Sequence, residues 1–195
     1  MSKKSLVILI ITFVLGIVLG GTVIYYTITS QNNPTSNNNP EENETSLNLP
    51  TEGNDTIINT NSATTIRVVN EYDKSFFTAD KNLLIMFASW CPNCQAEISE
   101  IQKILQRYKN NKNINIVLIA HEFEETITDL ITLVEEDIDF GDVEIKLDLK
   151  RIIRKTIDPE ASTIPISYVV DKQGKVLDIY DNSLTLEQAI QMLEK

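Results

Sequence analysis

The sequence is poor in residues that bind metal ions. Its 195 residues include two cysteines, Cys91 and Cys94, and one histidine, His121. A structural zinc site takes about four protein ligands, drawn mostly from cysteine and histidine. Because the chain offers three such side chains, with the histidine well separated from the pair, we expect no zinc centre.

Positive charge is also scarce. The chain has 17 lysines and arginines against 28 aspartates and glutamates, which gives a formal net charge of −11 at pH 7. Domains that bind nucleic acid usually carry a basic patch or stripe. We therefore expect no nucleic-acid partner, and we interpret the acidity as a source of solubility.

One long run lacks charged residues altogether. Residues 6–26 are apolar and uncharged, and at about 1.5 Å per helical residue the run is long enough to cross a bilayer core of about 30 Å. Two lysines precede it, which favours a cytoplasmic N-terminus, and Tyr25 and Tyr26 end it, where interfacial aromatics belong. The run predicts a transmembrane helix, with residues 1–5 in the cytoplasm and the following chain outside the cell membrane.

A cleaved signal peptide is the alternative interpretation of this run. Its apolar region is usually shorter, about 7–15 residues, and a small-residue cleavage site follows it. The sequence shows no convincing site of that kind, and no cysteine follows the run to carry a lipid. We therefore favour a retained anchor.

Residues 27–65 have the composition of a linker. They are dense in Asn, Thr, Ser, Glu and Pro and poor in aromatic residues, so they lack the apolar surface that would offset the entropy of ordering. We predict a disordered tether, followed by a folded domain at residues 66–195.

The hydrophobic pattern of residues 66–195 predicts alternating strands and helices. The expected strands are 66–69, 83–88, 114–120, 143–147, 166–171 and 175–180, and the expected helices are 91–109, 124–138, 149–157 and 184–193. The order predicts an α/β fold with a mixed central sheet flanked by helices. Thr185 and Gln188 have the spacing of a capping box for the last helix.

The two cysteines lie where an apolar strand gives way to a helix, in Trp90-Cys91-Pro92-Asn93-Cys94. The first turn of a helix has unpaired N–H groups and a partial positive charge, so a thiol there ionises more readily, with a pKa that can fall from about 8.5 to about 3.5–7.5. Proline suits the first helical position. The pattern predicts thiol–disulfide exchange, in which the first thiolate attacks a disulfide and the second cysteine resolves the mixed disulfide.

Other interpretations of the pair stay open. Cysteines are often buried for packing alone, and a binding module could carry an inert Cys91–Cys94 disulfide, although so short a loop removes little unfolded-state entropy. A thiol peroxidase would need Thr or Ser three residues before the reactive cysteine, where this chain has Ala88. The succession of strand, Trp-Cys-x-x-Cys and amphipathic helix favours the redox interpretation.

Two motifs together resemble the thioredoxin fold and, within it, the extracytoplasmic redoxins of the TlpA/ResA/DsbE kind. One is MFASWCPNCQAE at residues 86–97, and the other is TIPISYVVDKQGKV at residues 163–176. The helix and strand expected between residues 124 and 147 match the segment that this group carries beyond plain thioredoxin. An N-terminal anchor is also typical of the group.

The resemblance implies roles for individual residues. Cys91 resembles the exposed attacking cysteine, Cys94 the buried resolving cysteine, and Pro165 the cis-proline that faces the dithiol. A cis bond there would leave the backbone of Ile164 free to pair with an extended client segment; the residues alone would favour an ordinary trans proline at an edge strand. Further contacts with the client are implied for Trp90, Pro92 and Asn93.

The chain also departs from the pattern. Plain thioredoxin has a buried acid six residues before the first cysteine, where this chain has Ile85, and some relatives carry a glutamate between the cysteines. Glu97, one turn beyond Cys94, is interpreted as a solvated surface residue rather than a base. His121 is interpreted as structural or exposed, and we assign it no role.

The resemblance implies a membrane-tethered, extracytoplasmic thiol–disulfide oxidoreductase that needs no cofactor beyond the Cys91–Cys94 pair. Its partners would be protein clients, and as a reductant it would draw electrons from a membrane thiol donor of the CcdA/DsbD kind. Cytochrome c maturation or another exported client would be its purpose. A disulfide-forming oxidase stays open, because Pro92 and Asn93 do not fix the reduction potential.

Overall fold

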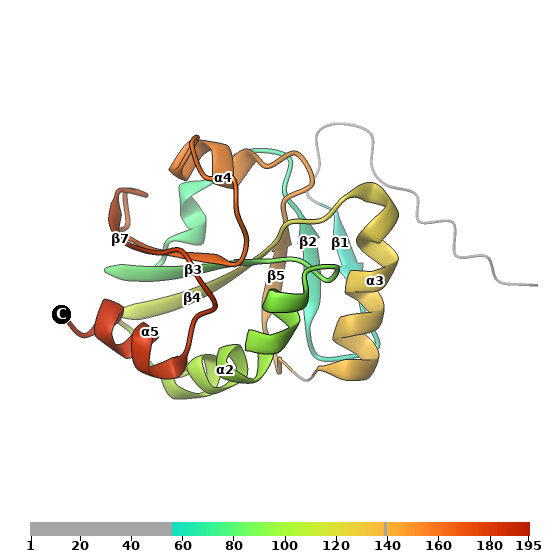
Figure 1. Cartoon of the computed structure of the whole chain (residues 1–195), viewed down its shortest axis with the longest axis horizontal. Coiled ribbons are helices and arrows are strands. Elements are labelled where there is room, and N and C mark those ends of the chain that lie inside the picture. The colour runs from blue at the N-terminus through green and yellow to red at the C-terminus, as the bar shows by residue number, and fades with distance from the viewer. Residues whose placement is uncertain (1–55, 139) are drawn as a thin grey trace, which may run out of the picture. The chain divides into compact units, whose positions relative to one another are not determined.

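The computed structural model describes residues 56–138 and 140–195, which form a seven-stranded mixed sheet between helices (Figure 1). The expected transmembrane helix at residues 6–26 and most of the expected linker lie outside the described residues. None of the helices in the described ranges has the length and apolar character that a bilayer crossing requires.

The strands lie in the order β1-β2-β5-β4-β3-β6-β7. Neighbours from β2 to β3 run parallel, whereas β1, β6 and β7 pair antiparallel with their neighbours. The bounds are β1 (Ile57–Asn59), β2 (Thr65–Val68), β3 (Lys81–Phe87), β4 (Ile114–Ala120), β5 (Glu144–Leu147), β6 (Ile166–Val170) and β7 (Val176–Tyr180).

Helices cover both faces of the sheet. The α-helices are α2 (Pro92–Tyr108), α3 (Ile127–Thr132), α4 (Ile152–Ile157) and α5 (Leu186–Leu193). Helices α2 and α5 lie side by side on one face, and α4 lies on the other with the short 3-10 helix Lys74–Phe76 (Figure 1). The capping box that Thr185 and Gln188 predict for α5 is confirmed.

Strand β3 lies at the centre of the sheet and is buried on both faces. Leu83, Ile85 and Phe87 point into the core shared with α2, α3 and α5. Leu84 and Met86 point into the second core, beneath α4. This alternation anchors the end of β3, so the residues that follow Phe87 start from a fixed position.

The expected linker ends earlier than predicted. Strand β1 pairs antiparallel with β2, with Ile58 opposite Ile66, and Ile58 packs against the core. The pairing satisfies backbone groups on the outer edge of β2, and Ile58 adds apolar surface to the core, whereas Ile57 is exposed. The folded part therefore begins before residue 66. The prediction missed this because the two isoleucines lie among polar residues whose composition is typical of a linker.

The expected single helix at residues 124–138 is also corrected. The segment is a 3-10 turn (Glu124–Thr126), then α3, then a π-helical turn (Leu133–Asp137). Leu133, Val134 and Ile138 are all buried, and Ile138 already has an extended backbone, so the helical segment ends at Asp137.

Candidate active site

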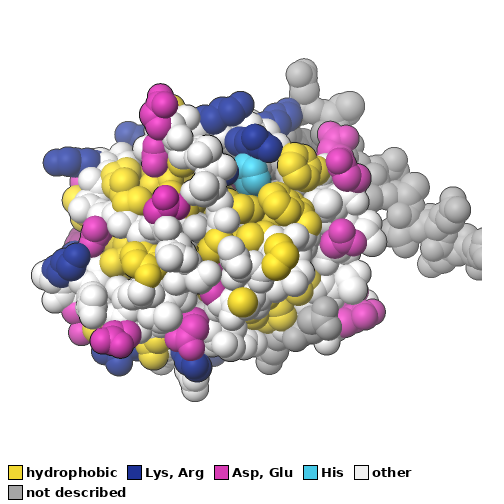
Figure 2. All heavy atoms as spheres, viewed as in Figure 1, with side chains coloured by type: hydrophobic (Ala, Val, Ile, Leu, Met, Phe, Trp, Pro, Cys, Tyr) yellow, Lys and Arg dark blue, Asp and Glu magenta, His cyan; other side chains and the backbone are white. Residues whose placement is uncertain are grey.

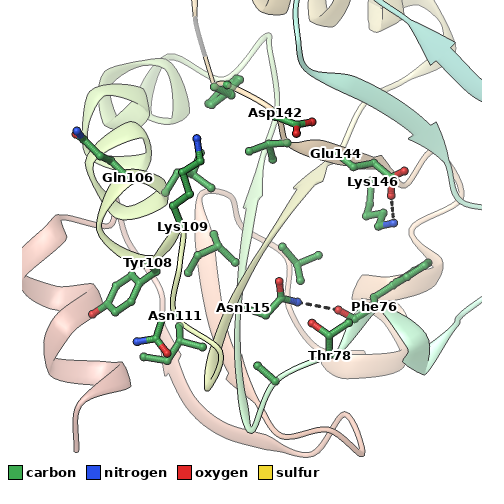
Figure 3. A pocket seen from close by; sticks show the side chains of 18 of the residues that line it. Phe76, Thr78, Gln106, Tyr108, Lys109, Asn111, Asn115, Asp142, Glu144 and Lys146 are labelled. Carbon is green, nitrogen blue, oxygen red and sulfur yellow. Dashed lines mark hydrogen bonds and ion pairs between the residues drawn. The ribbon is translucent and has the colours of Figure 1, made fainter.

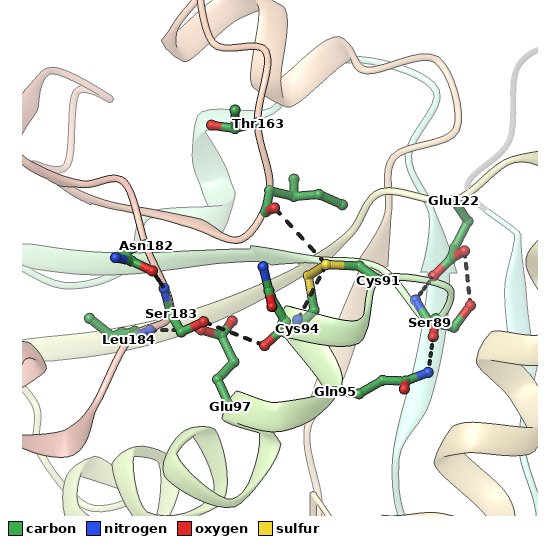
Figure 4. Close-up of a disulfide and its surroundings, with 12 residues drawn as sticks. Ser89, Cys91, Cys94, Gln95, Glu97, Glu122, Thr163, Asn182, Ser183 and Leu184 are labelled. Carbon is green, nitrogen blue, oxygen red and sulfur yellow. Dashed lines mark hydrogen bonds between the residues drawn. A yellow bond between two sulfur atoms is a disulfide. The ribbon is translucent and has the colours of Figure 1, made fainter.

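Cys91 and Cys94 form a disulfide at the point where the chain leaves β3 and enters α2 (Figure 4). Cys91 is the N-cap of α2, with extended backbone angles, and Pro92 occupies the first helical position. The N–H of Cys94 lies 3.2 Å from Sγ of Cys91 and points toward it. A sulfur anion on Cys91 would therefore lie at the positive end of the helix.

The two sulfurs differ in their access to solvent. Cys91 is 5% exposed and Cys94 is 0% exposed. The implied burial of Cys94 agrees with this, whereas the implied exposure of Cys91 is wrong for the disulfide form. The loop before β6 covers Cys91, because the carbonyl oxygen of Ile164 lies 4.0 Å from its Sγ.

The covering loop has the cis geometry that the resemblance implied. The Ile164–Pro165 peptide bond is cis. Two side chains hold the residue before it: Nη2 of Arg154 donates to the carbonyl oxygen of Thr163 at 3.0 Å, and Oγ1 of Thr163 donates to Asp181 at 2.8 Å. The backbone facing Cys91 is thus fixed from both sides. Sequence reasoning missed Arg154.

A buried carboxylate holds the chain on the other side of the disulfide (Figure 4). The N–H and Oγ of Ser89 donate to the two oxygens of Glu122, at 2.5 and 3.0 Å, and Thr126 donates to it at 2.6 Å. Gln95 of α2 donates to the carbonyl of Ser89. Burial raises the pKa of Glu122. No sequence pattern linked Ser89 to an acid in a distant loop.

Glu97 is buried, which corrects its interpretation as a solvated residue. It is 3% exposed, its Oε2 accepts the N–H of Leu184 at 2.7 Å, and its Oε1 has no hydrogen-bond partner among the described residues. Burial raises the pKa of Glu97 from an ordinary 4.5 to about 7. The helical period that turns Cys94, Ile98 and Ile101 inward also includes Glu97, and this was the signal available in the sequence.

The position of the missing thioredoxin acid is apolar here. Ile85 is fully buried and belongs to the same core as Cys94. Glu97 lies one turn along α2 from Cys94. It places a carboxyl group on the buried face of the helix that begins at the two cysteines. Glu97 is therefore a candidate acceptor for the proton of the Cys94 thiol, a role that the apolar side chain of Ile85 cannot perform.

Exposed aromatic side chains lie beside the disulfide. Trp90 and Phe123 are each 41% exposed, and their rings stack with centroids 5.6 Å apart. Pro92 and Asn93 are also exposed, so three of the implied client contacts are at the surface. Phe123, from the loop after β4, was not anticipated.

His121 is structural. It is 4% exposed, and its backbone N–H donates to the carbonyl of Phe87 at 2.7 Å. Burial, followed by the charges of Arg151 and Arg154, lowers the pKa of His121 to about 4. The ring is therefore neutral at physiological pH.

A hollow of about 1090 Å³ lies at the opposite end of the sheet (Figure 3). It is lined by residues at the amino end of β4 and at the carboxyl end of α2, among them Tyr108, Lys109, Asn111 and Asn115. Neither cysteine lines it, and no implied site residue does. The hollow is therefore separate from the disulfide site.

Comparisons with known proteins give likeness of structure. No family model matches the chain, and no curated protein matches it in sequence. The pneumococcal exposed lipoprotein thioredoxin Etrx1 from Streptococcus pneumoniae is similar, with 16% identity over 71% of this chain and 98% of that chain and a TM-score of 0.53. The chain has a thioredoxin-like fold. A secreted thiol-disulfide isomerase from Corynebacterium glutamicum is similar over 62% of this chain and 71% of that chain, with 16% identity and a TM-score of 0.50.

The disulfide and the cis-proline loop come from different parts of this chain. At these identities the likeness concerns the fold, and the chemistry has to be argued from the site. The site has a dithiol pair at a helix N-terminus, a carbonyl at 4.0 Å from the outer sulfur and a buried carboxyl one turn away.

Proposed function

We propose that this chain is a thiol–disulfide oxidoreductase that exchanges disulfides with protein clients through Cys91 and Cys94. The observation that carries the proposal is the Cys91–Cys94 disulfide at the N-terminus of α2, facing the cis Ile164–Pro165 bond. The names of the two similar structures, a lipoprotein thioredoxin and a thiol-disulfide isomerase, are in keeping with it.

The reductive reaction runs in two steps. The Cys91 thiolate, stabilised by the helix end and by the N–H of Cys94, attacks one sulfur of a client disulfide and forms a mixed disulfide, while the other client sulfur leaves as a thiolate. The Cys94 thiolate then attacks Sγ of Cys91. The client's second thiolate leaves, the client gains two electrons, and the Cys91–Cys94 disulfide forms.

Glu97 is the proposed acceptor of the Cys94 proton before the second step. A base is most effective when its pKa lies near the working pH, and burial raises the pKa of Glu97 to about 7. Its Oε1 has no partner among the described residues, and it lies one turn from Cys94 on the same helix. The proton of the buried thiol therefore has an acceptor without reaching bulk water.

The client would bind as an extended segment along the backbone before Pro165. Arg154 and Asp181 hold Thr163 on either side, so the Thr163–Ile164 backbone keeps a fixed position beside Cys91. Strand addition of this kind takes its affinity from main-chain hydrogen bonds. The enzyme can then act on clients of differing sequence.

The cellular setting is part of the proposal. The uncharged run at residues 6–26 supports a single-pass anchor in the cell membrane, with the N-terminus cytoplasmic and the thioredoxin-like domain extracytoplasmic. The resemblance to redoxins supports a reductant that draws electrons from a membrane thiol donor of the CcdA/DsbD kind. Apocytochrome c or another exported protein would be the client.

The decisive experiment compares two variants of the full chain. Cys91→Ser should abolish reduction of insulin disulfides, whereas Cys94→Ser should accumulate mixed disulfides, visible as reductant-sensitive bands on gels. If Cys91→Ser kept full activity, the proposed chemistry would be wrong. A reduction potential of about −270 mV for the Cys91–Cys94 pair would support the reductant, and one of about −120 mV would support the oxidase.

A further inference from the structure

Basic residues gather beside the disulfide although the chain as a whole is acidic. Four of the chain's 17 lysines and arginines lie within residues 150–155. Lys150 and Arg151 directly precede α4, and Arg154 and Lys155 belong to it. Figure 2 shows Lys and Arg side chains gathered on one side of the single histidine and apolar side chains on the other. The contact of Arg154 with Thr163 places this cluster next to the loop before Pro165.

Arg151 extends the exposed aromatic pair. Its guanidinium lies 5.6 Å from the centroid of the Phe123 ring, and the Phe123 ring lies 5.6 Å from that of Trp90. Arg151 itself has φ 59°, a left-handed backbone that few residues other than glycine adopt. We call these three residues, Trp90, Phe123 and Arg151, the rim.

In the part of the chain that the structure describes, the arginines of this cluster have no carboxylate partner. Among the described residues, no carboxylate oxygen lies within ion-pair distance of Arg151 or Arg154. Burial and then both guanidinium charges lower the pKa of His121, so this neighbour is neutral and adds no negative charge.

Two buried acids of the neighbouring loops are already engaged. Asp148 accepts the N–H groups of the first residues of α4: Ile152, Ile153 and Arg154. Glu122 accepts from Ser89 and Thr126. Neither acid therefore forms an ion pair with Arg151.

We propose that the rim recognises a client segment that carries an Asp or Glu side chain close to its disulfide-bonded cysteine. The inference rests on the proposed exchange function and names the class of client. The aromatic faces would take the apolar atoms of the segment, and Arg151 would bind the carboxylate. Trp90 is linked to Arg151 by two contacts of 5.6 Å each, through the Phe123 ring. An extended chain advances roughly 3.3 Å per residue, so the acid would lie roughly two to four residues from the cysteine.

Charge complementarity selects an acidic client over a basic one at this position. A chain of net charge −11 attracts basic partners in general. Within the described residues, however, Arg67 and Arg107 have ion-pair partners, whereas Arg151 and Arg154 have none. The preference should therefore be local, depending on where the acid lies relative to the cysteine.

The test uses the full chain, reduced and held in mild detergent, with synthetic peptides. Each peptide has one cysteine activated as its 2-thiopyridyl disulfide, and one Glu two, three or four residues to either side; a matched set has Gln instead. Attack by Cys91 on the peptide sulfur releases 2-thiopyridone, whose absorbance gives the second-order rate constant. Cys94 then releases the peptide thiol.

At one or more positions the Glu peptide should react about two- to fivefold faster than its Gln counterpart, as expected for an exposed ion pair. Arg151→Gln should lower the ratio of the Glu-peptide rate to the Gln-peptide rate to about one. Arg151→Glu should transfer the preference to a Lys peptide. The control Lys112→Gln, an equal charge change at an exposed site beyond the far end of the sheet, should keep the preference. High salt should reduce it.

Equal rates for Glu and Gln at every position would overturn this inference and leave the exchange function standing. A preference that survives Arg151→Gln would overturn it as well. If Arg151→Gln slowed all peptides equally, the rim would not select clients by charge, and the inference would be wrong. Arg151 would then act on the structure of the site or bind acidic residues of this same chain. Failure of the unaltered chain to react with any peptide would instead contradict the proposed function.

Discussion

The two ends of the central sheet differ in how they hold their charged residues. At the carboxyl ends of β3 and β4, beside the disulfide, Glu122 and Arg154 are buried and bind loop backbone. At the amino ends, around the hollow, Glu144 is partly exposed and pairs with Arg67 and Lys146. At the disulfide end, the charged side chains hold loop backbone in place. At the hollow end, they form ion pairs with one another in contact with solvent.

The difference shows where the fold tolerates an energetic penalty. Burying a charge is unfavourable unless hydrogen bonds compensate, so buried charges are informative where they occur. Here they surround the disulfide and leave two atoms without partners among the described residues, Oε1 of Glu97 and Nε of Arg154. The four predictions below challenge the contrast between the ends, beginning with the largest effect.

Removing the buried carboxylate should destabilise the chain far more than removing the exposed one. Glu122→Ala leaves the N–H of Ser89 buried without its acceptor, so the free energy of unfolding should fall by about 2–4 kcal/mol. Glu144→Ala, at the other end, should cost less than about 1 kcal/mol. Urea unfolding followed by the fluorescence of Trp90, the sole tryptophan, measures both. Similar losses for the two variants would erase the contrast.

The second prediction concerns the pH dependence that Glu97 confers. Burial raises the pKa of Glu97 from 4.5 to about 7, so between these pH values the folded chain keeps a proton that the unfolded chain has lost. Stability should therefore fall as pH rises through this window, by on the order of 2 kcal/mol. Glu97→Gln should remove that fall in unfolding experiments at pH 5, 6, 7 and 8.

The same variant also tests the proposed proton transfer. In the unaltered chain the release of mixed disulfides should accelerate as Glu97 ionises near pH 7, whereas Glu97→Gln should lack this step in its pH–rate profile. Glu100→Gln is the matched control on the same helix, because Glu100 is only partly buried and its pKa is lowered by hydrogen bonds from Leu186 and Lys103. An unchanged profile for Glu97→Gln would remove its role as the proton acceptor.

Much of the site could be predicted because its signals are local. The strand, the cysteine spacing and the proline at the helix start lie within one stretch, residues 83–94, and the structure keeps all three. The contacts that were missed join distant segments, such as Ser89 with Glu122. Glu97 was assigned to the surface because acidic residues are usually exposed. Its helical spacing from Cys94 and Ile101 was the stronger signal and indicated the buried face of α2. Strand β1 was missed because two isoleucines stand alone among polar residues.

The third prediction concerns the loop that faces the disulfide. Arg154→Met keeps the volume but loses the hydrogen bond to Thr163, so the loop before Pro165 should become less well fixed and the KM for a disulfide client should rise about fivefold, equivalent to about 1 kcal/mol. The reduction potential should stay within about 10 mV, because neither sulfur is touched. Arg67→Met, at the hollow end, should leave KM unchanged. A shift in potential without a change in KM would contradict a positioning role.

The smallest effect is expected at the hollow itself. Lys109→Ala and Lys112→Ala alter side chains that line it, in the turn between α2 and β4. Strand β4 spans seven residues, and at roughly 3.3 Å per residue its two ends lie roughly 20 Å apart, beyond the roughly 8–10 Å over which exposed charges act at physiological salt. Rates of disulfide exchange and the reduction potential should therefore stay within about twofold and about 10 mV of the unaltered chain. A larger loss in either variant would mean that the hollow is coupled to the disulfide through β4, and the two ends of the sheet would have to be treated as one site.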